Sequence, residues 1–223
     1  MRKLSPVVRA LVIAMTLGFL FYNQARPLVA WMTAHLLVSP NLLHGELWQP
    51  FTSLFLNTRL SGLIFTVIGL WWVGEFIESS KGPRFFLKLF LGAGAAANLA
   101  AGLVSFALPG AVGAVRGDGA AFALTAIFVV FARLYGARPA QIWGALAMRA
   151  DYFTWIVIGF SLVMSLVNGD WGGLAGELVA IAIGFALTGG LAEVRSRWGG
   201  PKGRARVKYR VLDGGKRTPT YFN

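Results

Sequence analysis

Residues 60–82 read LSGLIFTVIGLWWVGEFIESSKG, and this stretch decides the fold class. Its first part, residues 60–77, holds Glu75 as its single charged residue. A helix needs about 20 mainly apolar residues to cross roughly 30 Å of hydrocarbon, so this part is suited to span a membrane. Five more stretches of this kind lie around it: residues 7–23, 85–108, 119–135, 152–167 and 172–192. The sequence therefore predicts an all-α membrane protein with six transmembrane helices.

The composition agrees with this class. Hydrophobic residues make up 56% of the 223 residues and charged residues 13%, with a mean hydropathy of +0.62, which lies outside the range of soluble domains. The 28 glycines fit packed transmembrane helices, since Gly lets helix backbones approach closely in a bilayer. The chain has no cysteine and two histidines, His35 and His44, which excludes disulfides and thiolate sites and argues against a multi-histidine metal centre. We expect no cofactor and no metal.

The basic residues predict the orientation, because Lys and Arg beside short loops stay in the cytoplasm. With six spans and a cytoplasmic N-terminus, 18 of the 21 basic residues fall on the cytoplasmic side. The three on the other side are Arg26, Arg59 and Arg116. Both termini are therefore predicted to be cytoplasmic. This split also explains the formal net charge of +12 without a nucleic-acid partner.

Residues 1–195 form one predicted membrane domain. Its first loop, residues 24–59, contains an apolar stretch, residues 28–38, that is too short to span a bilayer. We interpret this stretch as re-entrant or interfacial, and Trp31 and Trp48 suit the headgroup region.

Residues 196–223 are rich in Gly, Lys and Arg and are predicted to form a flexible cytoplasmic tail. Basic residues near a membrane surface bind anionic lipid, so we expect the tail to contact such lipid. The predicted location is a multi-pass position in the lipid bilayer, and in the cytoplasmic (inner) membrane if the source is bacterial.

Four motifs follow one another along the chain. They are Trp48-Gln-Pro-Phe-Thr52 in the first loop, Gly74-x-x-x-Glu78-x-x-x-Gly82 at the end of the second predicted helix, Gly117-Asp118-Gly119-Ala-Ala at the start of the fourth, and Asp170-Trp-Gly172-Gly173-Leu at the start of the sixth. In this order and spacing, the chain from about residue 42 to residue 191 resembles the rhomboid family of intramembrane proteases. Arg116 stands where the family's helix-4 pattern has its first glycine, so that match is partial.

The departures from the family pattern concern its chemistry. The resemblance implies a nucleophilic serine at the mouth of helix 4 and a histidine base at the mouth of helix 6. The matching positions hold Asp118 and Asp170, and two carboxylates cannot replace a Ser–His pair. The family's two hydrogen-bond donors to the oxyanion, on helix 2, correspond to Gly62 and Thr66, so one donor is absent and the other is a hydroxyl.

We therefore expect a rhomboid-like pseudoprotease. What the resemblance implies for such a protein is binding of transmembrane segments of client proteins without cleavage. Two alternatives remain open: an unconventional or residual intramembrane endopeptidase, and a proton-linked membrane carrier.

The two aspartates have two interpretations. Both stand at predicted helix starts, where Asp is a favoured N-cap. If they instead face each other, the two carboxylates would share a proton, as in an aspartyl dyad. Arg116, two residues from Asp118, is available to neutralise that aspartate.

Glu177 is the candidate functional acid, because it lies about five residues into the sixth predicted helix. An unpaired carboxylate costs roughly 2.5–3.5 kcal/mol in a membrane, so we expect Glu177 to be neutral or bonded to Ser161 or Ser165. Glu78 lies near the end of the second helix, where extension of the side chain to the interface or pairing with Lys81 accounts for it.

Overall fold

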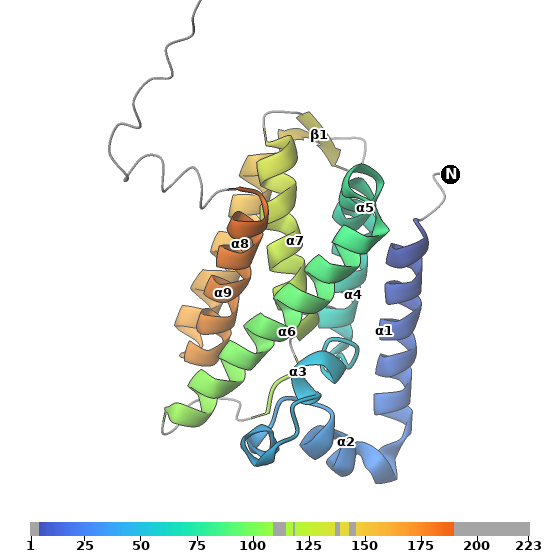
Figure 1. Ribbon diagram of the computed structural model, residues 1–223, viewed down its shortest axis with the longest axis vertical. Helices are drawn as coiled ribbons and strands as arrows, with labels where there is room; N and C mark the ends of the chain where they lie inside the picture. The colour runs from blue at the N-terminus through green and yellow to red at the C-terminus, as the bar shows by residue number, and fades with distance from the viewer. Residues whose placement is uncertain (1–4, 109–114, 118, 137–138, 143–145, 190–223) are drawn as a thin grey trace, which may run out of the picture. The chain divides into compact units, whose positions relative to one another are not determined.

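The computed structural model describes residues 5–108, 115–117, 119–136, 139–142 and 146–189 (Figure 1). Within these ranges, long helices occupy the predicted spans: α1 (Pro6–Gln24), α4 (Leu60–Gly69) with the π-helical turn η3 (Leu70–Gly74) and α5 (Glu75–Lys81) continuing it, α6 (Pro83–Ala107), α7 (Gly119–Tyr135), α8 (Ala150–Val167) and α9 (Trp171–Leu187). The first loop contains four short elements: η1 (Arg26–Leu28), α2 (Val29–His35), η2 (Pro40–His44) and α3 (Gln49–Thr52). The predicted tail, residues 196–223, lies outside the described residues.

A short antiparallel pair of strands, β1 (Pro139–Ile142) and β2 (Leu146–Arg149), connects α7 to α8. The sequence analysis does not predict these strands. The described chain is therefore mostly helical, with one small two-stranded sheet between helices.

Three helical segments in the described ranges are long and apolar enough to cross a membrane: α1, the run from Leu60 to Lys81, and α6. The other predicted spans coincide with α7, α8 and α9, which are apolar but shorter. The fold is thus that of a multi-pass helical membrane protein, and a count of six spans stays a prediction.

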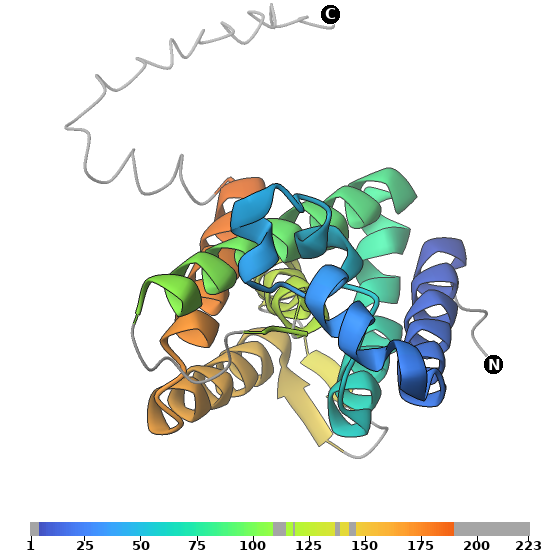
Figure 2. The same ribbon diagram turned by 90° about the horizontal axis from the view of Figure 1, so that it is seen from below.

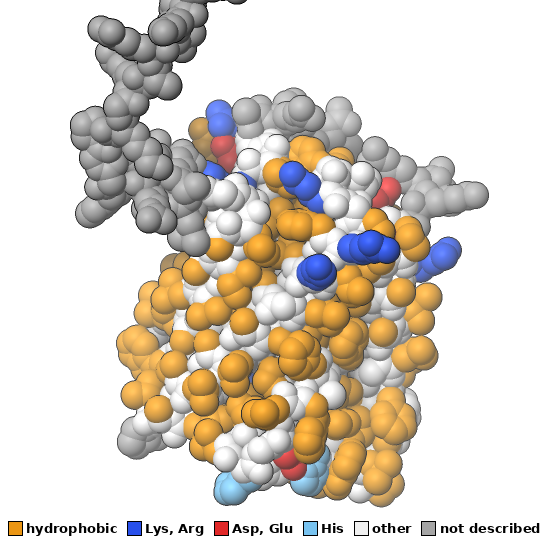
Figure 3. All heavy atoms as spheres, in the orientation of Figure 1, with side chains coloured by type: hydrophobic (Ala, Val, Ile, Leu, Met, Phe, Trp, Pro, Cys, Tyr) orange, Lys and Arg blue, Asp and Glu red, His pale blue; other side chains and the backbone are white. Residues whose placement is uncertain are grey.

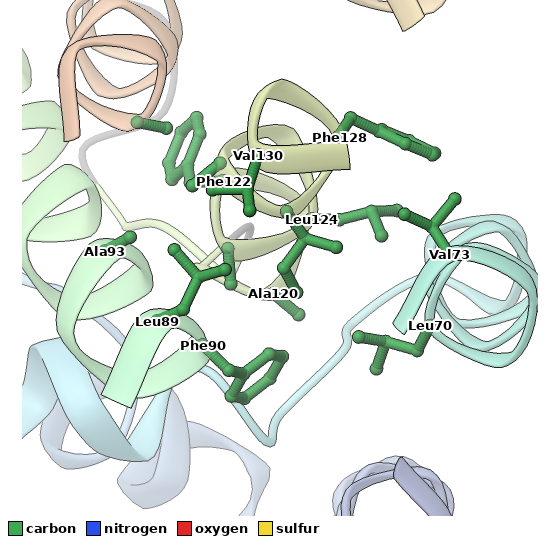
Figure 4. Packing of buried hydrophobic residues seen from close by; sticks show 14 of the residues in the cluster. Leu70, Val73, Leu89, Phe90, Ala93, Ala120, Phe122, Leu124, Phe128 and Val130 are labelled. Carbon is green, nitrogen blue, oxygen red and sulfur yellow. The ribbon is translucent and has the colours of Figure 1, made fainter. Parts of the chain in front are cut away.

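Helix α7 lies at the centre of the helices, as its end-on view in Figure 2 shows. Its side chains from Phe122 to Ala132 are all buried. A helix that is apolar on every side is suited to such a position, because each face must meet another apolar surface. Figure 4 shows side chains of α7, including Leu124, between Leu70 and Val73 on one side and Leu89 of α6 on the other.

Small residues allow α9 to pack closely against α6 and α7. A Cβ atom added at Gly172 would overlap the Ser105 hydroxyl and lie 2.7 Å from the Ala101 carbonyl oxygen, both on α6. At Gly176 it would lie 2.7 Å from the Phe122 ring on α7. Such close approach adds dispersion contacts, which stabilise helix pairs where lipid offers no hydrophobic driving force.

Helix α8 packs on α7 and α9 and leaves most of its surface uncovered. Thr154 and Ile158 are its buried residues within the described side chains. Large apolar side chains such as Ile156 and Phe160 are more than 60% exposed. This surface suits contact with lipid or with another apolar helix.

The surface in Figure 3 has a broad apolar middle and a polar region at each end. Lys and Arg side chains gather at the end where α1 begins, and histidine side chains lie at the opposite end. This distribution follows the predicted charge asymmetry of the described chain. The location of the termini relative to a membrane stays a prediction.

Candidate functional site

Arg116 and Asp170 form a two-point ion pair at the end of the helices where α7 and α9 begin. Arg116 Nη1 lies 2.7 Å from Asp170 Oδ1, and Nη2 lies 2.8 Å from Oδ2. The Arg116 side chain is 4% exposed and the Asp170 side chain 26%. Charge-assisted pairs with this two-bond geometry are among the strongest polar contacts in proteins.

Asp170 is also the N-cap of α9. Its Oδ1 accepts a hydrogen bond of 2.8 Å from the backbone N–H of Gly173, which confirms the predicted capping role. Burial acts to raise the pKa of the Asp170 carboxyl, but the hydrogen bonds from Arg116 and Gly173 outweigh it and hold this pKa below its ordinary value. Asp170 is therefore ionised and is a weak base.

Arg116 also ties the first loop to this site. Its backbone N–H donates to the Val38 carbonyl at 2.8 Å, and the Val38 N–H donates to the Arg116 carbonyl at 3.1 Å. Three segments therefore meet at one residue: the first loop, the segment before α7, and the start of α9.

The predicted neighbour of Arg116 was Asp118, which lies outside the described residues. The structure instead places the Arg116 guanidinium on Asp170. An ion pair between positions 54 residues apart in the chain leaves no periodic signal, so the sequence analysis missed it.

The two oxyanion positions on α4 offer little to a substrate. The Thr66 hydroxyl donates to the Gly62 carbonyl at 2.8 Å, within its own helix. Thr66 is also 1% exposed, so its hydroxyl does not reach solvent. Nearby Asn57 is 6% exposed, and its Nδ2 has no partner within the described residues.

Glu177 is 5% exposed in α9 and accepts a hydrogen bond from the Ser161 hydroxyl of α8. This contact confirms one of the two predicted partners. The other carboxyl oxygen, Oε2, is buried with no hydrogen-bond partner within the described residues.

A cavity of about 500 Å³ lies beside these groups. It is lined by Leu37, Thr58 and Arg59 of the first loop, by Val115, Arg116 and Gly117 before α7, by Ser161, Met164 and Ser165 of α8, by its C-cap residue Asn168, and by Asp170. Volumes of about 300–1,000 Å³ are typical of ligand sites.

The glycines of the motifs serve packing and turns. Gly82 has a positive φ of 86°, which ends α5 and allows the chain to turn into α6. A Cβ at Gly74 would lie 2.9 Å from the Phe86 ring, one at Gly117 would lie 3.0 Å from Thr58, and one at Gly119 would lie 2.7 Å from Asn98. These residues position the helices.

Trp48 and Gln49 organise the first loop. The Trp48 Nε1 donates to the His35 carbonyl at 2.9 Å. Gln49 is fully buried, with its Oε1 accepting from the Ser39 N–H at 2.8 Å and its Nε2 donating to the Ala34 carbonyl at 2.9 Å. The first-loop motif points to Trp48, but the role of Gln49 could not be predicted, since nothing in the local pattern shows what a loop amide contacts.

The position of Glu78 differs from the one predicted from the sequence. It is 4% exposed and does not extend to the interface; its carboxylate accepts from the Ser5 hydroxyl at 2.7 Å, the Val7 N–H at 3.1 Å and the Val8 N–H at 2.9 Å. A carboxylate at the start of a helix satisfies free N–H groups and complements the helix dipole. Glu78 of α5 therefore caps α1 from outside that helix, and the pairing predicted with Lys81 is wrong.

The fold and site define a multi-pass helical membrane protein with a polar cavity beside a partly buried ion pair. The profile of a family described as "Eukaryotic integral membrane protein (DUF1751)" matches residues 9–188. The chain belongs to this family. Its description names eukaryotic proteins, which does not support the conditional placement in a bacterial inner membrane. No curated protein matches the chain.

Proposed function

We propose that this protein is a rhomboid-like pseudoprotease that binds transmembrane segments of client proteins without cleaving them. The proposal includes six spans with both termini in the cytoplasm. The order of the motifs and the agreement of long helices with the predicted spans support it.

The observation that carries the proposal is the Arg116–Asp170 pair. In the resembled family the position of Asp170 holds the general base. Here that carboxylate is occupied by two bonds from Arg116 and one from Gly173, and its lowered pKa makes it a weak base. An endopeptidase that used Asp170 would first have to break this pair.

The nearby hydroxyls differ in what they contact. Ser105 lies 3.5 Å from Arg116 Nη1, a cation that cannot remove a proton, so this contact weighs against an endopeptidase that uses Ser105. The Ser161 hydroxyl donates a hydrogen bond to the Glu177 carboxyl, so this pair keeps the unconventional endopeptidase open as an alternative.

Client binding has a physical basis in α8 and the cavity. The exposed apolar surface of α8 offers packing to a second helix, and the cavity offers hydrogen bonds. In a bilayer, packing and interhelical hydrogen bonds are the forces that associate helices.

A proton-linked carrier is the second candidate, and the buried Glu177 favours it. An ionisable residue inside a membrane is a functional candidate in general. Proton uptake by liposomes that contain the protein, abolished by Glu177→Gln, would favour the carrier over the client binder.

Crosslinking tests client binding. The chain has no cysteine, so a single one at Phe65 of α4 or Met164 of α8 can carry a photoreactive group. A transmembrane reporter helix should crosslink to positions 65 and 164 and stay intact. Leu17, which is 60% exposed on α1, is the matched control position. Equal yield at position 17, or a cleaved reporter, would contradict the proposal.

A further inference from the structure

Two polar residues of α8 and its C-cap residue line one side of the cavity. Ser161, Ser165 and the C-cap Asn168 lie four and three positions apart, so they share one face at the end of the helix. The neighbouring Phe160 and Val163 on other faces are more than half exposed and apolar. The polar face of α8 is therefore directed to the cavity, away from the apolar exposed surface.

This face presents mainly hydrogen-bond acceptors. Ser161 uses its single proton on Glu177, which leaves its oxygen lone pairs to accept. The Asn168 Nδ2 donates to the Met164 carbonyl at 2.8 Å, which leaves its Oδ1 as an acceptor. The Ser165 hydroxyl has no hydrogen-bond partner within the described residues and can both donate and accept.

The charges and the acceptors around the cavity together favour a neutral occupant. Arg116 and Asp170 neutralise each other, and Arg59 is an exposed cation at the first-loop wall. A basic side chain would be repelled by Arg59. A carboxylate would be attracted by Arg59 but would meet the acceptors of α8, which offer it few donors. A neutral group that both donates and accepts fits these neighbours.

Glu177 holds Ser161 in its acceptor role. Its carboxyl accepts from the Ser161 hydroxyl, and Glu177 itself is not among the described residues that line the cavity. The Ser161 proton is therefore directed away from the cavity, and its oxygen is left to accept from an occupant with N–H groups.

We propose that the cavity receives an amide side chain, Asn or Gln, from the transmembrane segment of a client. An amide NH₂ donates to Ser161 and Asn168, and its carbonyl accepts from Ser165. This inference rests on the proposed function, and it names the client class: helices with an amide at the depth of the α8 polar face.

The test uses a leucine-rich reporter helix with one Asn placed at successive depths. Met164→Cys carries the photoreactive group, because Met164 lines the cavity without a polar side-chain atom of its own. Crosslinking should peak at one depth, roughly 3- to 15-fold above the all-Leu helix, as expected for one interhelical hydrogen bond in a membrane.

A wall variant, Ser165→Ala with Asn168→Leu, should lose this peak and still capture the all-Leu helix. Ser79→Ala, an exposed serine of α5, is the matched control and should keep the peak. Capture with no depth preference would overturn the inference and leave the proposed function standing. A stronger crosslinking peak with Lys or Asp in place of Asn would contradict the proposal that the occupant is an amide side chain. Absence of capture for every helix would overturn the proposed function itself.

Discussion

The Arg116 guanidinium holds the Asp170 carboxylate with bonds of 2.7 and 2.8 Å, while its backbone pairs with Val38. One residue thus connects the first loop, the start of α7 and the cap of α9. The cavity lies between these segments and α8, so its shape depends on this pair.

We expect strong coupling between Arg116 and Asp170. Breaking a buried ion pair by changing one partner costs about 3–5 kcal/mol, and the partial exposure of Asp170 favours the lower value. Asp170→Asn keeps the cap, because Asn caps as well as Asp. The double variant with Arg116→Gln should cost less than the sum, by about 2 kcal/mol. The free energies of unfolding of the detergent-purified native protein, the two single variants and the double variant measure this coupling.

The exposed pair Arg149–Asp151 is the matched control. It has similar geometry, with distances of 3.1 and 2.6 Å, but its arginine side chain is 50% exposed, against 4% for Arg116. Its cycle should show much weaker coupling. Equal coupling in the two cycles would contradict the importance assigned to burial.

The stability should depend on acid pH through Asp170. Its pKa is lower in the folded protein than in the unfolded chain, where Asp has a pKa of about 3.9. The stabilisation is therefore complete above that value and is lost as the pH falls through the folded pKa. Unfolding measured from pH 7 to pH 2 should show a steeper loss below about pH 4 for the native protein than for Asp170→Asn. Identical slopes would show that Asp170 does not carry this dependence.

The helices could be predicted because each depends on local information. Residues 60–77 and 85–108 are apolar over the length of a span, and the structure has helices there. The cap at Asp170 also follows from its place before an apolar run. Glu177 and Ser161 could be anticipated as partners, since a carboxyl inside a membrane helix needs one.

The long-range polar contacts could not be predicted. Ser5 and Glu78 are 73 residues apart, and no periodicity connects them. A buried acid at the end of an apolar helix signals that a partner exists, but it does not identify the partner. The strand pair Pro139–Ile142 and Leu146–Arg149 was missed because its register depends on pairing across a turn.

Glu78→Gln should destabilise the protein by roughly 2–3 kcal/mol. The change removes the charge and one acceptor from three hydrogen bonds at the start of α1, and bonds to a charged group contribute about 1.5–3 kcal/mol. Lys81→Gln is the control and should change stability little. If Lys81→Gln were as destabilising as Glu78→Gln, the cap of α1 would not be the function of Glu78. Thermal unfolding distinguishes these outcomes.

The predicted topology can be measured with single cysteines and a membrane-impermeant thiol reagent. Positions 112 and 169 should react in intact cells, and positions 80, 140 and 210 only after permeabilisation. This follows from 18 of 21 basic residues lying on the cytoplasmic side. Labelling of position 210 in intact cells would contradict six spans with a cytoplasmic C-terminus.

The central claim is that this protein binds a transmembrane segment and leaves it intact. The most direct measurement reconstitutes the protein with an equimolar reporter helix that carries a different fluorophore at each end. We predict energy transfer within the reporter that persists over hours, together with co-isolation of reporter and protein. Loss of energy transfer with two separated fragments would show proteolysis and contradict the account.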